Sequence, residues 1–331
     1  IEAPIRFYVT ENTDGTATLS WKTPGFVFAP YMDEGGSALQ ELARELDLPI
    51  VCDNDVHFLG AEDHDVHDTL CCISMQKMKD GPQNFSIIKQ GISFHSSMTS
   101  DVDDFYYGTP VTNTRYPNRG MLTQKGFNHL MKCIEAMLDV LGDEVGLALD
   151  CGPGMTVQDA LKLGKAVEGS NVVWLEDMIT GDYTPYVLAD LYLQVTPNTS
   201  TAIHTGEQIY LRQNFVELIE RNAVNVIGPD PADVGGLSEM KFIAEYADLH
   251  GILFAPHGTL DGLLGLAAHV QLAAALPDNY IAFELPDGNP KWWYDILNGL
   301  DELVVKDSHI KVPDAPGLGV SFRVEEAQQY L

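Results

Sequence analysis

Residues 145–176 read VGLALDCGPGMTVQDALKLGKAVEGSNVVWLE, and this stretch contains one complete strand–helix–strand unit. The apolar runs VGLAL and VVWL flank a segment in which Thr156 precedes Asp159 by three residues, which resembles the capping box that starts a helix. An acidic residue directly follows each run, Asp150 in the first case and Glu176 in the second. This arrangement is typical of a βαβ crossover in a parallel sheet.

Apolar runs and helical stretches alternate in the same way on both sides of this unit. In one such stretch Leu237, Met240, Ala244 and Ala247 recur at the spacing of one helix face, and Gly251 follows as a stop signal. Eight strands with intervening helices in about 215 residues match the usual size of a TIM barrel, an α/β fold. We expect the strands at residues 70–75, 86–94, 145–149, 172–175, 201–205, 224–227, 252–255 and 281–283.

The N-terminal segment before the first expected strand lacks this alternation and has the pattern of a small α+β unit. Residues 5–10 and 16–21 have the composition of strands, and the Asp-Gly pair between them favours a hairpin. A short helix is expected at 37–46. The run of acids and histidines at 52–68 fits no metal-ligand spacing, so we interpret it as a solvated loop.

The composition argues against nucleic acid and membrane as partners. The chain carries 48 acidic and 19 basic residues, a formal net charge of −29, which repels nucleic-acid backbones and anionic lipid. Its longest apolar stretch, 263–276, is interrupted by His269 and Gln271 and is too short to cross a bilayer.

The five cysteines form no CxxC pair and no disulfide-like spacing, which favours a reducing compartment. No signal peptide is visible, so we expect a cytoplasmic protein.

Six consecutive expected strands are each followed by an acidic residue or a histidine. Neighbours in this series lie 23 to 31 residues apart, about one βα unit. Functional residues of a TIM barrel sit at the carboxyl ends of its strands, so the spacing places all six side chains on one rim. The series consists of Asp150, Glu176, Glu207, Asp230, His257 and Glu284.

The first three members of the series predict a metal site. Carboxylates of Asp150, Glu176 and Glu207 that converge on one point cannot all ionise without a cation beside them. Three oxygen ligands favour Mg²⁺, with further positions open to water and substrate. Such an ion can bind a substrate carboxylate and stabilise the charge that develops when the neighbouring C–H bond is deprotonated.

The remaining three members predict a proton-transfer site. His257 can act as the base, because a histidine titrates near neutral pH. Asp230, one strand earlier, is placed to accept the other imidazole N–H and to raise the basicity of the ring. Glu284, on the far side of His257, can donate a hydrogen bond to an enediolate oxygen if its carboxyl group is protonated.

The segments around these residues resemble the strand-end motifs of the mandelate racemase-like subgroup of the enolase superfamily. The match extends from about Asp143 to Glu284 and consists of LALDCGPG, VVWLEDM, HTGEQ, GPDPADVGGLSEMKFIAEYADLHGI, FAPHG and FELP. The resemblance implies a modified (β/α)-barrel at 69–290 and a small N-terminal α+β capping domain at 1–68, which is either reduced or partly missing from this chain. A C-terminal tail at 291–331 is then expected to pack back on the capping domain. A homo-oligomer with one Mg²⁺ per subunit is also implied.

The resemblance assigns the same roles that the spacing suggests. It implies Asp150, Glu176 and Glu207 as metal ligands, the Asp230–His257 pair as the catalytic dyad and Glu284 as its electrophilic partner.

Two positions depart from the family pattern. The family's second strand often ends in Lys-x-Lys; here Lys89 matches the first lysine, and Gly91 replaces the second. Lys89 is therefore a candidate catalytic residue, whereas a two-base racemase lacks its second lysine. Gly152 stands where many members have asparagine.

A long segment at 95–119 follows the second expected strand, and a loop of that length is more often functional than accidental. We expect it to fold over the barrel mouth, where His95, Tyr106 or Arg115 can contact substrate. His204 and His269, in contrast, are interpreted as packing residues.

The resulting hypothesis is an Mg²⁺-dependent lyase that dehydrates an acid sugar, an aldonate or aldarate, to a 2-keto-3-deoxy acid. A single histidine base that later protonates the leaving hydroxyl suits elimination better than racemisation. The alternatives are an epimerase or cycloisomerase on a related hydroxy acid and a non-catalytic metal-binding barrel. A metal-dependent hydrolase and a Schiff-base aldolase are disfavoured, because 70–75 contains no histidine and 223–228 contains no lysine.

Overall fold

The computed structural model describes residues 8–11, 17–20, 84–92, 104–107, 121–152, 154–179, 189–258, 262–285, 291–299 and 305–330. Its centre is a six-stranded parallel sheet whose strands lie side by side in chain order. This order is that of a barrel wall, because the strand order of a doubly wound sheet reverses. The strands are β3 (Ile87–Gly91), β4 (Gly146–Asp150), β5 (Val172–Glu176), β6 (Ala202–Thr205), β7 (Val226–Ile227) and β8 (Leu253–Phe254).

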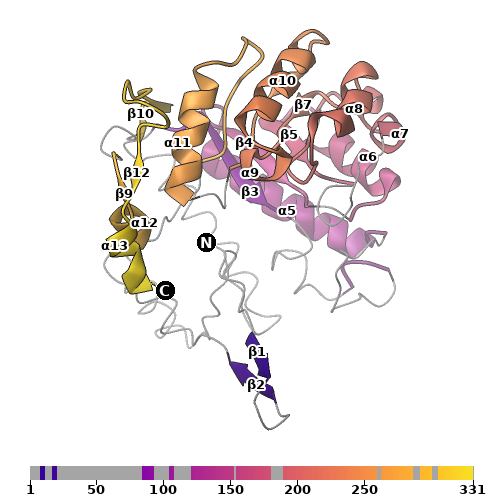
Figure 1. Cartoon of the computed structure of the whole chain (residues 1–331). Coiled ribbons are helices and arrows are strands. Elements are labelled where there is room, and N and C mark those ends of the chain that lie inside the picture. The colour runs from indigo at the N-terminus through magenta and orange to yellow at the C-terminus, as the bar shows by residue number, and fades with distance from the viewer. Residues whose placement is uncertain are drawn as a thin grey trace.

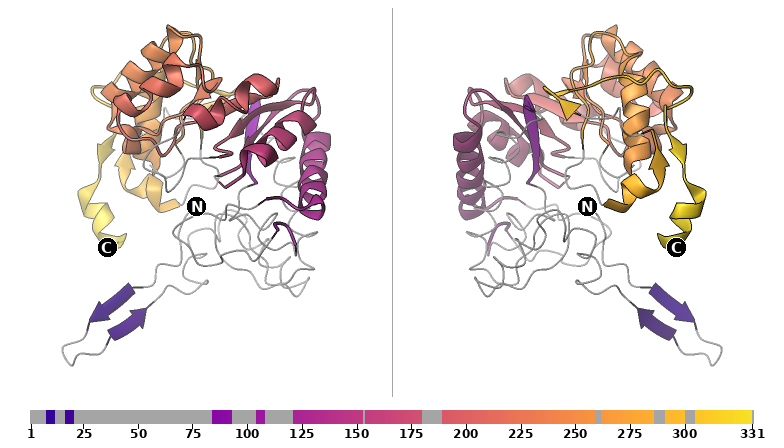
Figure 2. Two further views of the ribbon diagram at one scale, coloured as in Figure 1. Left: turned by 90° about the vertical axis from the view of Figure 1, so that its right-hand side faces the viewer. Right: turned by 90° about the vertical axis from the view of Figure 1, so that its left-hand side faces the viewer.

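Helices connect the strands and cover the outer face of the sheet (Figures 1 and 2). The long α5 starts where the Thr123 hydroxyl caps the Gly126 amide, and it buries an apolar stripe that includes Leu130 and Ile134. In α6 the Thr156 hydroxyl accepts from the Asp159 amide, as the sequence predicts. The α-helices of the barrel are α5 (Gln124–Leu141), α6 (Val157–Ala166), α7 (Ala189–Tyr192), α8 (Val216–Glu220), α9 (Pro231–Val234), α10 (Leu237–Asp248) and α11 (Gly262–Ala273). Short 3-10 turns lie at η3 (Thr196–Asn198) and η4 (Arg212–Asn214).

Register brings the carboxyl ends of the strands together. Gly91 pairs with Asp150, Asp150 pairs with Glu176, and Glu176 pairs with His204. Residues paired across parallel strands lie at the same height in the sheet. The strand-end acids of β4 and β5 therefore lie at one edge, as the spacing predicts.

The strand expected at 281–283 is not observed. The segment runs beside β8, since the Ile281 amide donates to the Phe254 carbonyl and Tyr280 forms a parallel bridge with Phe254, but it forms no strand. Pro256, the next residue in register, accepts from the Glu284 amide and has no N–H to return. The ladder therefore stops, although Glu284 still reaches the rim.

Other expectations are confirmed where the structure describes them. The expected strands from 86–94 to 252–255 are observed with shifts of at most three residues at their ends. At the N-terminus β1 (Tyr8–Glu11) and β2 (Ala17–Ser20) pair antiparallel, as expected of a hairpin. The expected strand at 70–75, the helix at 37–46 and the loop at 52–68 lie outside the described residues.

The C-terminal segment packs on α11. Leu297 and Trp293 join an apolar cluster with Leu263, Leu266 and Val270 of that helix. Within the described ranges, no helix combines the length and apolarity that crossing a membrane requires. The segment contains α12 (Lys291–Asp295), β9 (Leu297–Asn298), β10 (Val305–Lys306), β11 (His309–Ile310), β12 (Ser321–Phe322), α13 (Val324–Ala327) and η6 (Gln328–Tyr330).

Candidate active site

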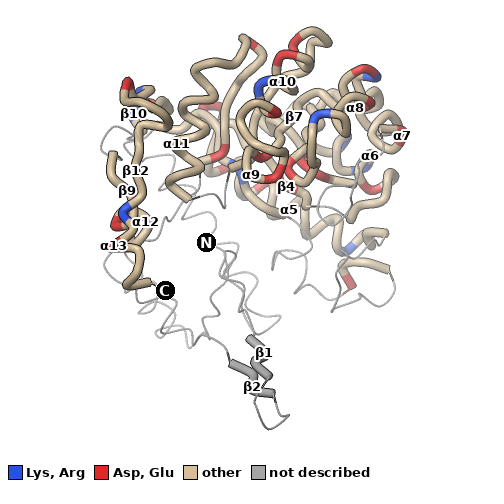
Figure 3. Tube along the Cα trace, in the orientation of Figure 1, with Lys and Arg blue, Asp and Glu red and all other residues tan. Residues whose placement is uncertain are grey.

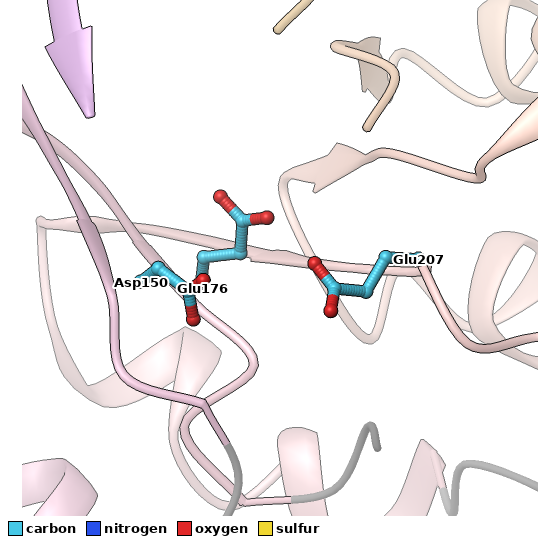
Figure 4. A group of neighbouring side chains, drawn as sticks. All are labelled: Asp150, Glu176 and Glu207. Carbon is cyan, nitrogen blue, oxygen red and sulfur yellow. The ribbon is translucent and has the colours of Figure 1, made fainter. Parts of the chain in front are cut away.

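Three carboxylates converge at the carboxyl ends of β4, β5 and β6. One ligand oxygen from each of Asp150, Glu176 and Glu207 lies within 4.8 Å of the others. Figure 4 shows the Glu207 carboxylate pointing toward the other two side chains, and Figure 3 shows acidic positions gathered beside the end of β4. The structure therefore brings together the three residues that the sequence proposes as metal ligands.

Local backbone geometry aims these side chains. Gly206 has a φ of 143°, which only glycine adopts readily, and it turns the chain between β6 and Glu207. The Gly152 amide donates to Oδ1 of Asp150 at 2.8 Å. Position 152, where the family often has asparagine, thus still supplies a polar contact to Asp150 through its backbone.

The electrostatics of the cluster fit a divalent cation. Oε2 of Glu207 is buried and has no hydrogen-bond partner among the described residues. Burial, together with the charges of Asp177 and Asp150, raises the pKa of Glu207 well above its usual value. Burial also raises the pKa of Asp150 to about 6, although Lys89 opposes this effect. All donors are hard oxygen atoms, so Mg²⁺ is the ion that suits them best.

Lys89 connects this cluster to the far side of the site. Its Nζ lies 3.0 Å from Oε1 of Glu176 and 2.9 Å from Oε1 of Glu284. Burial disfavours the charged ammonium, but these two carboxylates outweigh it and raise the pKa of Lys89 well above its usual range. The side chain is 18% exposed and lies between the two carboxylates, two residues before the end of β3.

Asp230 and His257 form a hydrogen-bonded pair. The Nδ1 atom of His257 lies 2.7 Å from Oδ2 of Asp230, while Oδ1 of Asp230 accepts from the Ala232 amide at 2.7 Å and caps α9. Burial disfavours the charged form of Asp230, but the hydrogen bond from His257 and the capping amide hold its pKa below the usual value. The aspartate is therefore charged, and its orientation is fixed by the helix that it caps.

The second nitrogen of His257 faces the carboxylate cluster. Nε2 lies 3.5 Å from Oε2 of Glu207 and 3.5 Å from Oε2 of Glu284. Burial lowers the pKa of His257, but Glu284 and the hydrogen bond to Asp230 outweigh it and raise that pKa to about 9. Nε2 of His257 therefore opens toward the proposed metal site, and the role of this residue as a base remains a prediction.

Glu284 departs from the sequence-based expectation of a protonated carboxyl. Burial raises its pKa, but Lys89 and His257 outweigh this effect and hold the pKa below its usual value. Its carboxylate also accepts from the Gly258 amide at 3.4 Å. In this geometry Glu284 is a charged acceptor shared by two cations, and its catalytic role remains a prediction.

Of the three residues proposed to contact substrate, the structure describes Tyr106. This residue forms an antiparallel bridge with Leu122, and its ring meets that of Phe105 edge-on at 4.9 Å against the core. Burial raises its pKa. These contacts are structural, and a contact between Tyr106 and substrate remains a prediction. His95 and Arg115 lie outside the described residues.

Two residues next to the carboxylate cluster were not proposed for the site. Trp174 Nε1 donates to Oε2 of Glu176 at 3.0 Å, and His204 Nδ1 lies 3.6 Å from the same oxygen. The sequence predicts a packing role for His204 and a strand position for Trp174. The available signal was their spacing: Trp174 precedes Glu176 by two residues on one strand, so both side chains point to the same face of the sheet.

Comparisons with known proteins agree on one family. Residues 120–327 match the family described as enolase C-terminal domain-like. The D-xylonate dehydratase of Haloferax volcanii is 29% identical over 243 residues, which cover 73% of this chain and 57% of that protein. The arabinonate dehydratase of Saccharolobus solfataricus is 29% identical over 199 residues, which cover 60% of this chain and 50% of that protein. The chain thus spans about half the length of the curated relatives it matches.

A solved structure shares the fold. The mandelate racemase/muconate lactonizing enzyme-like protein from Rubrobacter xylanophilus superimposes with a TM-score of 0.66 and 25% sequence identity. The alignment covers 79% of this chain and 60% of that one. This likeness supports the modified (β/α)-barrel that the sequence predicts, and the six observed strands form part of its wall.

Proposed function

Because the chain belongs to the enolase C-terminal domain-like family, in the mandelate racemase-like subgroup of the enolase superfamily, we propose that it is an acid sugar dehydratase. The reaction removes the proton α to the carboxylate of an aldonate or aldarate and expels the β-hydroxyl as water. Ketonisation of the resulting enol gives a 2-keto-3-deoxy acid. The observation that carries this proposal is the Asp230–His257 pair, whose free Nε2 opens toward the carboxylate cluster.

The cluster of Asp150, Glu176 and Glu207 would hold one Mg²⁺ per subunit. When bound, this ion supplies positive charge that stabilises the negative charge developing on the substrate carboxylate. Positive charge held beside Glu207 would oppose the carboxylates that raise the pKa of His257 to about 9 and would favour the neutral imidazole that a general base requires.

His257 carries the proton through both halves of the reaction. Its Nε2 takes the proton from the α-carbon while Nδ1 keeps its hydrogen bond to the charged Asp230, which stabilises the imidazolium. The same imidazolium then gives that proton to the departing β-hydroxyl, so the hydroxyl leaves as water. Lys89, held between two carboxylates, supplies a second positive charge for an anionic substrate.

Two observations support elimination over isomerisation. Both reported relatives are dehydratases of acid sugars by name. In addition, β3 ends in Gly91 where a two-base enzyme of this family has its second lysine. An epimerase or cycloisomerase is the second candidate function. Lys89 and His257 lie on either side of the Glu284 carboxylate, so Lys89 can carry a proton on the side opposite His257.

The finer features of the sequence-based hypothesis belong to this proposal. They are a capping domain at 1–68, a tail at 291–331 that packs on it, a homo-oligomer, cytoplasmic location and substrate contacts from His95, Tyr106 and Arg115. An isotopic test separates the dehydratase from its rivals.

The full chain is incubated with Mg²⁺ and a panel of aldonates and aldarates, and 2-keto-3-deoxy acids are quantified. We expect at least one substrate to be dehydrated, with loss of product formation in the His257→Asn variant. Exchange of the α-proton with solvent deuterium without dehydration would favour the epimerase or cycloisomerase. Mg²⁺ binding without exchange on any acid would favour the non-catalytic barrel.

A further inference from the structure

Two stacked aromatic rings lie inside the barrel, beside the carboxylate cluster. The indole of Trp174 on β5 and the imidazole of His204 on β6 have centroids 5.3 Å apart and planes inclined by 20°. Trp174 is 6% exposed and His204 is 1% exposed. Neither ring takes part in the proton transfer, so their position calls for a different explanation.

The surrounding sequence makes room for both rings. Trp174 pairs in register with Ala148 on β4 and with Ala202 on β6, and these small neighbours leave space for an indole inside the barrel. A Cβ atom added to Gly228 would lie 2.3 Å from Nε2 of His204. Any larger residue at position 228 would therefore displace the imidazole.

The two rings connect the metal site to the segment that carries the base. Trp174 Nε1 donates to Oε2 of Glu176 at 3.0 Å. His204 Nε2 lies 3.0 Å from the carbonyl of Ala255, which precedes His257 by two residues, and donates to it. The indole is thus clamped against a ring that is itself fixed to the strand end near His257.

The hydrogen bond from Trp174 occupies one specific oxygen of a proposed ligand. Oε2 of Glu176 accepts from the indole N–H, whereas Oε1, which also accepts from Lys89 Nζ at 3.0 Å, is the oxygen that faces the site. With Oε2 held by the indole, Glu176 would offer a cation Oε1 alone. Mg²⁺ requires near-octahedral geometry with single-oxygen ligands, whereas Ca²⁺ accepts six to eight oxygens and readily takes carboxylates through both.

We propose that Trp174, held in place by His204, is a positioning residue that keeps Glu176 bound through one oxygen and so makes the site selective for Mg²⁺ over Ca²⁺. The inference rests on the proposed function, because it requires Glu176 to be a metal ligand. Partners that orient metal ligands typically contribute about 10- to 100-fold in metal affinity.

The decisive substitution is Trp174→Phe, which keeps an aromatic ring beside His204 and removes only the N–H donor and part of the ring. Dissociation constants for Mg²⁺ and Ca²⁺ are measured by calorimetry on the full chain, the variant and Trp292→Phe. Trp292 is a matched control, since its ring contacts Trp293 and Tyr330, away from the carboxylates. We expect Trp174→Phe to weaken Mg²⁺ binding by about 10- to 100-fold and Ca²⁺ binding by less, so that the selectivity ratio falls by about tenfold.

A general loss of packing predicts a different pattern, because it weakens both ions equally. An unchanged ratio of the two dissociation constants in Trp174→Phe therefore overturns the inference. If that variant does not fold, His204→Asn, which removes the stacked ring and leaves the indole N–H, takes its place with the same expected direction. A wild-type chain that binds neither ion overturns the metal site itself together with this inference, whereas wild-type binding with an unshifted ratio overturns the inference alone.

Discussion

The Nδ1 atom of His257 lies 2.7 Å from Oδ2 of Asp230, although these residues follow two different strands of the barrel, β8 and β7. The same aspartate caps the short helix α9 through its other oxygen. The orientation of its carboxylate is therefore fixed independently of His257. A charged acceptor on Nδ1 leaves Nε2 free, and this tautomer is the one that a base facing the carboxylate cluster requires.

Asp230→Asn is expected to reduce kcat/KM by about 10- to 100-fold, because the amide no longer stabilises the imidazolium. The pH profile provides a second readout. The hydrogen bond to Asp230 raises the pKa of His257, and a base acts only after it loses its proton, so activity rises with pH through that pKa. Removing the carboxylate lowers the pKa, and the acidic limb of kcat/KM moves to lower pH. A limb that stays in place or moves to higher pH contradicts this assignment.

His257→Asn separates proton transfer from metal binding. We expect a loss of about 10²- to 10⁴-fold in turnover, the usual contribution of a general base, with Mg²⁺ affinity within a few-fold of wild type. The measurements are α-proton exchange by NMR and Mg²⁺ titration by calorimetry. Residual exchange at the wild-type rate would assign the base to another group, and Lys89 is the first to test.

Glu207→Gln has opposite effects on two properties. Its amide removes a charge from a carboxylate whose pKa burial, Asp177 and Asp150 raise, so the metal-free protein gains stability and melts a few degrees higher. Mg²⁺ affinity falls by more than about 100-fold, because losing a mere hydrogen-bond partner of a ligand already costs about 10- to 100-fold. For wild type, Mg²⁺ at 100 times its Kd adds about 2.7 kcal/mol of stability. Calorimetric melts with EDTA and with Mg²⁺ check both signs, and a variant that Mg²⁺ still stabilises refutes the ligand role.

The rim of the site was predictable because strand ends mark it in the sequence. Asp150 and Glu176 each follow an apolar run, and parallel register then brings them to one edge. The Trp174–His204 pair was not predictable in this way, because a stack between two strands depends on which residues face inward at the same height. The space for the two rings depends on three small residues, Ala148, Ala202 and Gly228. Nothing in the sequence alone links the small size of these residues to the rings.

His269 shows the same division between pattern and packing. The apolar helix around it predicted a packing role, and the structure confirms a buried ring stacked on Phe283 at 5.3 Å. Its closeness to the site could not be predicted: a Cβ added to Gly258 would lie 2.4 Å from its Nε2. Helix periodicity identifies the buried face and does not identify the loop that this face supports.

His269 is expected to make the fold sensitive to acid. Burial is the largest effect and lowers its pKa to about 4, against the ordinary value of 6.5, so the unfolded chain binds this proton first as the pH falls. The stability is fully present above pH 6.5 and is lost between there and about pH 4, up to about 3 kcal/mol. His269→Gln removes this contribution, and urea unfolding at pH 7 and pH 5 measures it. His250→Gln, which changes a histidine that follows α10, is the matched control. An equal loss of stability in wild type and His269→Gln contradicts the assignment.

Gly91→Lys tests the proposal that the chain catalyses elimination and not isomerisation. A Cβ atom added at this position meets nothing within 4 Å, so the first atom of a larger side chain displaces no neighbour. Gly91 pairs with Asp150 at the end of β3, and the new ammonium would enter the carboxylate edge two residues beyond Lys89. A base there would approach the α-carbon from the side opposite His257, as in family members with Lys-x-Lys. We therefore expect Gly91→Lys to gain slow interconversion of the C2 epimers of the sugar acid, with weaker dehydration.

Gly91→Met is the control for bulk, since it lengthens the side chain without a base. NMR in deuterated solvent follows label at C2 in both epimers: scrambling in the lysine variant alone supports a one-base wild-type enzyme, and scrambling already present in wild type assigns the second base to Lys89 and favours the epimerase.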